Sequence, residues 1–288
     1  MTDPEAMDPS ETTPPVPERR HGDRRRSDRR SPRVRIAAVG DIHVSQETAG
    51  KHRALLARAN DEADVLLVAG DLTRHGTAAE MRTAVTELSD VTIPIVAVLG
   101  NHDYEAGEAG EACDILRAHG VHLLDGDAFR LNEQVGIAGA KGYMGGFGRR
   151  RLTSFGEPST KEFVAVCMEE VHKLELALQS LSTPTRIALL HYAPISETIE
   201  GEPEQIFPFL GTDRLAEPLD RYEAAVCFHG HAHRGSFSGH TQGGVPVFNV
   251  AHEVLHQSGA GEAYFLYELP LETEEEEEEP VEAGSAGA

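Results

Sequence analysis

Five short polar blocks, each of which follows a run of apolar residues, constrain this chain of 288 residues more than any other feature. The apolar runs VRIAAV, VLLVA, IVAVL, RIALL and AAVCF are rich in β-branched residues, as strands are. The blocks that follow them are GDIH (40–43), GDL (70–72), GNHD (100–103), a lone His191 and GHAH (230–233). Strands that end together in a sheet would place these side chains on one edge. The blocks supply three Asp, one Asn and five His, a donor set that suits two hard or borderline divalent metal ions.

The spacing of the first three blocks predicts repeated strand–helix units. Asp41, Asp71 and Asn101 lie 30 residues apart, close to the length of one βαβ unit. Periodicity predicts helices over residues 47–60, 78–88, 110–119 and 160–181, and two short strands with a turn within 130–140. Gly243-Gly244 predicts a hairpin between the penultimate pair of strands, AAVCF and VPVFNV. These elements indicate an α/β fold in which helices flank sheet layers.

Length and composition indicate one large domain with a tail at each end. The domain is expected over residues 34–271, enough chain to bury a large core. Residues 1–33 are expected to be a disordered Arg-rich arm, and residues 272–288 a disordered acidic tail. The sequence shows no secretory signal and no run of about 18 apolar residues, and its three Cys lack metal-ligand spacing. We therefore expect a soluble cytoplasmic protein with reduced thiols and no membrane span.

The charge distribution bears on the partners of the chain. The formal net charge at pH 7 is −22, of which −15 falls within residues 34–271. An acidic body disfavours nucleic acid as the main partner, because contacts to phosphates need Lys and Arg. The Arg-rich arm leaves contact with nucleic acid or another anionic surface open.

The series GDIH, GDL, GNHD, His, GHAH resembles, in order, the motif series of the calcineurin-like metallophosphoesterase family. The resemblance covers essentially all of residues 34–269. It implies an αββα sandwich, with two mixed β-sheets flanked by helices and a metal site at the strand ends. It also implies two divalent metal ions, with Mn, Fe, Zn and Co all open. The first ion would be held by Asp41, His43 and His233, the second by Asn101, His191 and His231, and both would be bridged by Asp71.

Elementary chemistry agrees with these implied roles. Two cations about 3.5–4 Å apart need a shared anionic ligand to offset their repulsion, and a carboxylate such as that of Asp71 bridges them compactly. In an extended segment, the spacing of His231 and His233 places both rings on one side. Asn101 offers a neutral oxygen, which leaves the Lewis acidity of the metals for the substrate.

The resemblance further implies a catalytic role for His102, which lies between Asn101 and Asp103. It would stabilise the phosphoryl transition state and protonate the leaving oxygen, a role that suits an imidazole. Asp103 would orient the ring of His102 and hold its proton. The implied reaction is hydrolysis of a small phosphate ester by attack of a metal-bridging hydroxide, with a phosphodiester favoured over a phosphomonoester.

Two other functions remain open at this stage. A nuclease aided by the Arg-rich arm is disfavoured by the acidic body. A non-catalytic protein-binding scaffold on the same fold predicts missing ligands, whereas here the set is complete. Deletion of residues 1–33 would weaken a nuclease but not a hydrolase of small esters.

Two segments are candidates for selecting the substrate. The Gly-rich loop over residues 139–158 carries Lys141 and three Arg at 149–151, which suit a phosphate or a charged head group. After His191, Phe207, Phe209 and Leu210 either wall the site or pack into the core. A solvated surface loop is an equally good interpretation of the first segment.

Overall fold

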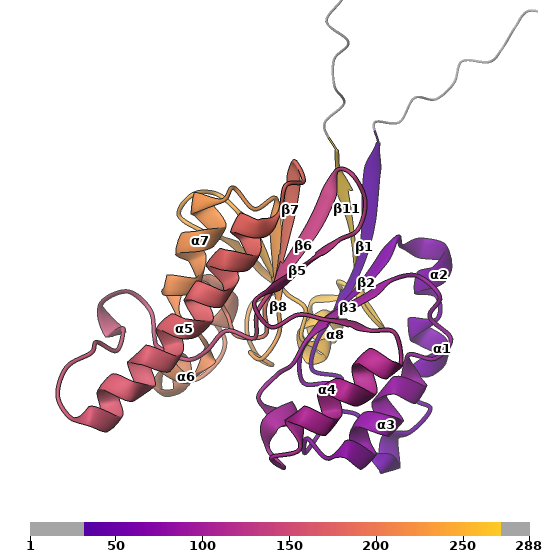
Figure 1. Cartoon of the computed structure of the whole chain (residues 1–288), viewed down its shortest axis with the longest axis horizontal. Helices are drawn as coiled ribbons and strands as arrows, with labels where there is room; N and C mark the ends of the chain where they lie inside the picture. Colours follow the sequence, from indigo (N-terminus) through magenta and orange to yellow (C-terminus); the bar gives the residue numbers. More distant parts are fainter. Residues whose placement is uncertain (1–31, 272–288) are drawn as a thin grey trace, which may run out of the picture. The chain divides into compact units, whose positions relative to one another are not determined.

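A computed structural model describes residues 32–271 as strands and helices that build two sheets (Figure 1). The predicted acidic tail, and the predicted arm apart from Pro32 and Arg33, lie outside these residues. The strands are β1 (Arg33–Val39), β2 (Val65–Ala69), β3 (Ile95–Val98), β4 (His122–Leu123), β5 (Asp127–Arg130), β6 (Val135–Gly139), β7 (Thr185–Leu189), β8 (Val226–His229), β9 (Ser238–His240), β10 (Pro246–Asn249) and β11 (Phe265–Pro270). The helices are α1 (Arg53–Leu56), α2 (Ala59–Glu62), α3 (Ala78–Glu87), α4 (Ala109–Ala118), α5 (Pro158–Ser180), α6 (Phe207–Leu210), α7 (Ala216–Arg221) and α8 (His252–Ser258).

The first sheet has the strand order β11-β1-β2-β3-β4. Strands β1 to β4 run parallel, and β11 pairs antiparallel with β1 at the edge. Every residue of β2 and β3 is buried, which explains why these strands are continuous apolar runs rather than alternating ones. The parallel order of β1, β2 and β3 confirms the βαβ units predicted from the 30-residue spacing.

The second sheet has the order β5-β6-β7-β8-β10-β9, with four parallel strands between two antiparallel edge strands. Successive side chains along its strands point to opposite faces of the sheet, so they pack alternately into two hydrophobic cores. Ile187 and Leu189 join the cluster that includes the first sheet, whereas Ala188 joins the cluster under α5. In Figure 1, α1 to α4 lie beside the first sheet, and α5 and α7 beside the second. The predicted αββα sandwich of two mixed sheets is confirmed.

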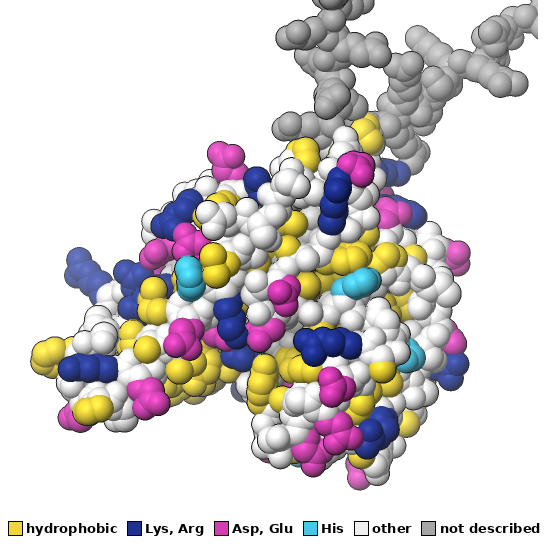
Figure 2. Space-filling view, viewed as in Figure 1, with side chains coloured by type: hydrophobic (Ala, Val, Ile, Leu, Met, Phe, Trp, Pro, Cys, Tyr) yellow, Lys and Arg dark blue, Asp and Glu magenta, His cyan; other side chains and the backbone are white. Residues whose placement is uncertain are grey.

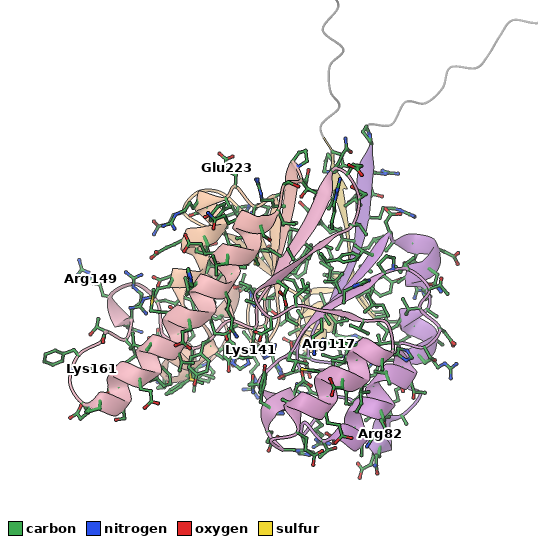
Figure 3. The ribbon with its side chains drawn as sticks, in the orientation of Figure 1. Arg82, Arg117, Lys141, Arg149, Lys161 and Glu223 are labelled. Carbon is green, nitrogen blue, oxygen red and sulfur yellow. The ribbon has the colours of Figure 1, made fainter. Side chains whose placement is uncertain are left out.

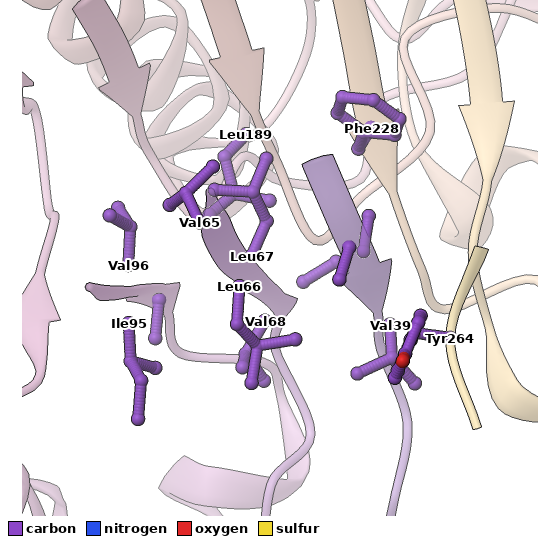
Figure 4. Packing of buried hydrophobic residues seen from close by; sticks show 14 of the residues in the cluster. Val39, Val65, Leu66, Leu67, Val68, Ile95, Val96, Leu189, Phe228 and Tyr264 are labelled. Carbon is purple, nitrogen blue, oxygen red and sulfur yellow. The ribbon is translucent and has the colours of Figure 1, made fainter. Parts of the chain in front are cut away.

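Buried side chains between the two sheets hold the strands, and with them the strand ends, in position. In Figure 4, side chains of β2 such as Val65 and Leu67 pack near Leu189 of the second sheet, and Phe228 of that sheet lies farther from them in the same cluster. Leu67, Leu189 and Phe228 are fully buried. Complete burial of a side chain of this size contributes about 1.5–3 kcal/mol. The strand ends of both sheets therefore lie on a rigid support.

Three of the four predicted helices are confirmed as α3, α4 and α5, but the helix predicted over residues 47–60 is wrong. The chain there forms a 3-10 turn at Gln46–Thr48 and the short helices α1 and α2. Gly50 has φ +83°, and the buried carboxylate of Glu87 accepts backbone N–H groups from Gly50, His52 and Arg53. These tertiary hydrogen bonds outweigh the local helix preference of the segment. No helix within residues 32–271 is long and apolar enough to cross a membrane.

The predicted hairpin joins a different pair of strands. VPVFNV forms β10, which runs parallel to β8, so the prediction of a hairpin with AAVCF is wrong. The turn at Gly243-Gly244 instead joins β10 to β9, with Pro246 opposite His240. Strand β9 has the sequence SGH, which carries no apolar pattern because it forms the edge of the sheet.

Candidate metal centre

Backbone hydrogen bonds join the loops that follow the strands of both sheets. Asp41 N donates to Gly70 O at 3.0 Å within the first sheet's edge, and Gly230 N donates to His191 O at 3.1 Å within the second. The two edges meet where His231 N donates to the carboxylate of Asp41 at 2.9 Å. The carboxyl ends of both sheets therefore converge on one place.

Seven of the polar side chains from the motif blocks gather there. Two groups have ligand atoms that all lie within 4.8 Å of one another: Asp41, His43, Asp71 and His233 form one, and Asp71, His191 and His231 form the other. Asn101 joins the second group, because its Oδ1 lies 2.9 Å from His191 Nε2. This grouping coincides with the two ligand sets that the sequence predicts, although ligation itself stays a prediction.

Asp71 belongs to both groups, and its two oxygens face different members. Oδ1 lies 3.5 Å from His191 Nε2, and Oδ2 lies 3.8 Å from His43 Nε2. Oδ1 also accepts the backbone N–H of His102 at 2.8 Å. Oδ2 is buried and has no hydrogen-bond partner in the part of the chain that the structure describes. A carboxylate in this position can bind one cation through each oxygen.

The backbone of the site is strained. Among residues 32–271, five residues other than glycine have positive φ, and four of them are predicted ligands: Asp41 (57°), His43 (42°), Asp71 (49°) and His231 (70°). Each such conformation costs on the order of 1–3 kcal/mol and persists only where the surroundings impose it. The concentration of strain at these four residues indicates that the fold orients them for a purpose other than stability.

Glycines in the motif blocks let the backbone approach the carboxylates. A Cβ on Gly230 would lie 2.2 Å from Asp41 Oδ2, and a Cβ on Gly100 would lie 2.0 Å from Asp71 Oδ1. No side chain fits at such distances. The glycine that begins each of these two blocks is thus required by close contact with a predicted ligand.

The electrostatics of the site fit a bound cation. Burial, together with the nearby carboxylates of Asp41 and Asp103, raises the pKa of Asp71 to about 8. Burial alone would raise the pKa of Asp41 too, but its hydrogen bond to His233 and the surrounding imidazoles hold that pKa below its ordinary value. Asp71 therefore lacks a compensating positive charge, and a divalent ion would supply it.

The histidines are suited to bind metal as neutral rings. Burial lowers the pKa of His43 to about 4 and that of His231 to about 3, and it also lowers the pKa of His191. His233 differs, because although burial acts in the same direction, its hydrogen bond to Asp41 raises its pKa to about 9. A bound cation would compete with that proton.

In two histidines a backbone carbonyl engages one ring nitrogen and so determines which nitrogen is left for a metal ion. His191 Nδ1 donates to Ala69 O at 2.9 Å, which leaves Nε2 as the nitrogen able to act as the predicted ligand. His231 Nε2 donates to Phe209 O at 3.2 Å, which leaves Nδ1. Each carbonyl thus sets both the tautomer and the orientation of the ring.

His102 is placed differently from the seven predicted ligands. Its Nδ1 lies 2.7 Å from the carbonyl oxygen of Arg74 and donates to it, so Nε2 is the nitrogen left for another partner. The ring packs edge-on against that of His43, with 4.6 Å between centroids. Its side chain is 39% exposed, so a substrate can reach it.

The role suggested for Asp103 is wrong. Its carboxylate is fully buried and accepts hydrogen bonds from Thr73 N at 2.9 Å, Thr73 Oγ1 at 2.6 Å and Gly100 N at 2.9 Å. It therefore ties the loop after β2 to the loop after β3. The ring of His102 is oriented by Arg74 O instead.

Two residues that support the GHAH block were not identified from the sequence. His229 is fully buried, with Nε2 at 2.8 Å from Thr198 Oγ1 and Nδ1 at 2.8 Å from Gly230 O. Asn249 Nδ2 donates to Ala232 O at 2.8 Å. A histidine that directly ends the apolar run AAVCF is the one sequence signal that would have drawn attention to this support.

The arginines of the loop over 139–158 do not converge on the metal centre. Arg150 pairs with Glu204 at 3.0 Å, and Arg151 pairs with Asp213 at 3.4 Å. Arg149 extends outward from the loop in Figure 3, far from Lys141 in that view. These contacts favour the interpretation that the three arginines belong to a solvated surface loop.

Lys141 and the aromatic segment after His191 lie closer to the site. The ammonium of Lys141 lies 5.3 Å from the ring centre of Tyr192, which in turn lies 4.4 Å from the ring of His231. Phe209, whose carbonyl holds His231, has a side chain that is 55% exposed. Leu210 is buried and therefore packs rather than lining the site.

Glu253 is expected to strengthen metal binding through His233. Its Oε2 is buried, has no hydrogen-bond partner in residues 32–271, and lies 3.9 Å from His233 Nδ1. A carboxylate behind a ligating imidazole orients the ring, and its loss lowers metal affinity about 10–100-fold. Glu253→Gln should therefore weaken binding of the ion that His233 is predicted to hold, measured by chelator competition. Glu262→Gln, which removes an exposed carboxylate, is the control, and equal affinities in the two variants would contradict the expectation.

Comparison with known proteins identifies the family. A model of the family "calcineurin-like phosphoesterase" matches residues 34–235, more than half of the chain. The fold is similar to phosphopantetheinyl hydrolase (PptH) from Mycobacterium tuberculosis, at 15% identity and a TM-score of 0.59 over 81% of this chain and 95% of that one. The protein TT1561 of Thermus thermophilus is similar at 16% identity, with a TM-score of 0.48 over 77% of this chain and 91% of that one. A search of curated proteins found no match. The chain belongs to the calcineurin-like phosphoesterase family.

Proposed function

We propose that the chain is a dinuclear metal-dependent phosphoesterase that hydrolyses phosphodiesters or phosphomonoesters of small molecules. The observation that carries this proposal is the position of Asp71 between two ligand groups, with one oxygen toward each. The buried Oδ2 of Asp71 has no hydrogen-bond partner among the described residues, which costs free energy. A cation bound to this oxygen would remove that cost.

The proposed ligands divide into two sets that share Asp71. Asp41, His43 and His233 hold one ion, and Asn101, His191 and His231 hold the other. All of them offer oxygen or imidazole nitrogen and none offers sulfur, which suits Mn, Fe, Zn or Co. When bound, such ions supply an activated water molecule and neutralise charge on the phosphoryl oxygens.

His102 is proposed as the catalytic acid. Because Nδ1 is engaged by Arg74 O, a protonated ring can donate only from Nε2. From that atom it would stabilise the charge that develops on the phosphoryl group and give its proton to the leaving oxygen. The hydrogen bond from its backbone N–H to Asp71 keeps the ring beside the proposed metals.

The charged surface supports small esters rather than nucleic acid as substrates. The face in Figure 2 carries acidic and basic side chains interspersed, without a continuous basic stripe. The three arginines that the sequence offered for phosphate binding extend outward or pair with carboxylates. The scaffold alternative is disfavoured because the complete donor set comes together.

Metal-stripped protein, supplied again with Mn²⁺, Fe²⁺, Zn²⁺ or Co²⁺, tests the proposal on a bis-aryl phosphodiester and an aryl phosphomonoester. Turnover should depend on metal, and the ratio of the two rates decides between diester and monoester. We expect His102→Ala to keep both ions but to lower kcat about 10²–10⁴-fold, most for poor leaving groups.

The control is His172→Ala, which removes an exposed ring on α5. Unchanged turnover in His102→Ala would show that the acid is another group. Two bound ions without any turnover would favour the scaffold over the hydrolase.

A further inference from the structure

We propose that a hollow beside His102 receives the leaving group of the substrate and that Arg74 binds a negative charge on that group. The hollow lies between segments 45–47 and 74–80. The inference rests on the proposed function, because it names the substrate class of the same reaction: a phosphate ester whose leaving alcohol carries a carboxylate or a second phosphate.

The hollow has a volume of about 470 Å³, which accommodates a small organic group. Its lining includes Ser45, Gln46, Arg74, His75 and Thr77, and no large apolar side chain contributes to it. Such a lining would leave an acyl chain without apolar contacts. It favours a small hydrophilic leaving group.

Chain connectivity places the hollow next to the metal centre. Ser45 comes two residues after the proposed ligand His43, and Arg74 comes three residues after Asp71. The two segments are joined where they begin, since Arg74 N donates to Val44 O at 3.1 Å. Two or three residues span at most about 7–11 Å, so the wall of the hollow begins within that reach of the ligands.

His102 does not itself line the hollow, but it contacts both the metal centre and Arg74 of the hollow's wall. Its backbone N–H contacts Asp71, and its Nδ1 donates to the carbonyl of Arg74. The oxygen that departs from phosphorus must lie beside the acid that protonates it. The remainder of the leaving group then extends from His102 along Arg74.

Arg74 is the cation available in this hollow. Its side chain is exposed and forms no ion pair with any residue between 32 and 271. His75 already faces Glu105, with 3.4 Å between its Nδ1 and the carboxylate. A guanidinium presents a planar fork that matches a carboxylate or phosphate, so an anionic group on the leaving alcohol fits it.

Two carboxylates also line the hollow, and they affect it differently. Glu80 is buried and accepts the backbone N–H of His75 at 2.7 Å, so it supports the wall. Glu47 is exposed and opposes an incoming anion. Arg74 and Glu47 thus offer two substitutions with opposite expected effects.

Three esters with two-carbon leaving groups of different charge test the proposal: 2-phosphoglycolate, 2-hydroxyethyl phosphate and 2-aminoethyl phosphate. The metal-loaded full chain is assayed for kcat/KM and, independently, for Kd by calorimetry. We expect the anionic ester to be preferred over the neutral one. Arg74→Gln should lower that preference about tenfold, and Glu47→Gln should raise it.

The control is Arg82→Gln, which removes an exposed arginine of α3 that pairs with Glu111 (Figure 3). It should leave the ratio of the two esters unchanged. Equal preference for the three esters, or a preference that Arg74→Gln does not alter, overturns the proposal even if all three are hydrolysed. An Arg74-dependent difference in Kd without turnover would support the hollow and count against the hydrolase.

Discussion

Asp71→Asn is expected to remove both proposed metal ions and the proposed activity in one step. Asp71 is the residue shared by the two ligand groups, and each of its oxygens faces a different group. An amide keeps the shape but supplies one neutral oxygen, so it cannot offset the repulsion between two cations. Loss of Lewis-acid stabilisation worth several kcal/mol corresponds to a decrease in kcat/KM of about 10³-fold or more. Metal content and turnover of the same preparation measure both effects.

The same substitution should stabilise the metal-free protein. The pKa of Asp71 is raised to about 8 by burial and by the carboxylates of Asp41 and Asp103, whereas the pKa of an Asp in an unfolded chain is about 4. Between these pH values the unfolded chain has lost a proton that the folded chain keeps, so stability falls as pH rises. The gain in Tm of metal-free Asp71→Asn over the unsubstituted chain should therefore grow from pH 4 to pH 8.

Asp64→Asn is the matched control, because its carboxylate has the opposite environment. Although burial acts against it, the ion pair with Arg35 holds the pKa of Asp64 below its ordinary value. Its loss should lower Tm slightly and leave metal content unchanged. Two ions bound to Asp71→Asn with full turnover would remove the basis for a bridging carboxylate.

The sequence predicted the central strands of the sheets well because these strands are buried on both faces. β2 and β3 are continuous apolar runs with no exposed residue, and turn-forming glycines follow both. Such strands need no knowledge of their neighbours to be identified. The order of the motif blocks then predicted which strand ends lie together.

The elements that the sequence did not predict depend on contacts between distant residues. Glu87 binds the backbone of segment 50–53 and interrupts the expected helix, and apart from Gly50 nothing in that segment indicates this distant contact. β9 forms an edge, where the second face of the strand is not buried and the apolar pattern is absent. In both cases tertiary structure overrides local preference.

Within the site, residue types could be predicted but their supporting partners could not. Candidate metal ligands can be recognised in the sequence as Asp, Asn and His residues that follow strands. The carbonyl of Arg74, which orients His102, has none, because every residue has a carbonyl. For Asp103, the adjacent position of His102 in the sequence suggested a contact between the two side chains. In the fold, the Asp103 carboxylate instead accepts hydrogen bonds from Thr73 and Gly100.

Gly100→Ala is expected to cost more stability than most single substitutions. Its Cβ would lie 2.0 Å from Asp71 Oδ1 and 2.4 Å from Asp71 N. The second contact is with backbone, so no change of rotamer relieves it, and the loop after β2 must move. We expect a loss of about 3 kcal/mol in the free energy of unfolding together with weaker metal binding, because the displaced residue is the proposed bridge. Denaturant unfolding without metal, and metal titration, measure the two effects separately.

Gly110→Ala provides the control for the same chemical change. Gly110 lies in α4, and a Cβ there meets no atom within 4 Å. Gly110 is in the first turn, and alanine in a helix is more favourable than glycine by at most about 0.5–1 kcal/mol, so this variant should keep or gain stability. If Gly100→Ala unfolded at the same denaturant concentration as Gly110→Ala and bound two ions, the close approach of Gly100 to Asp71 would not be what holds the site. Opposite signs in the two variants, with metal affinity reduced in Gly100→Ala alone, would tie the absence of a Cβ at Gly100 directly to the position of the bridging carboxylate.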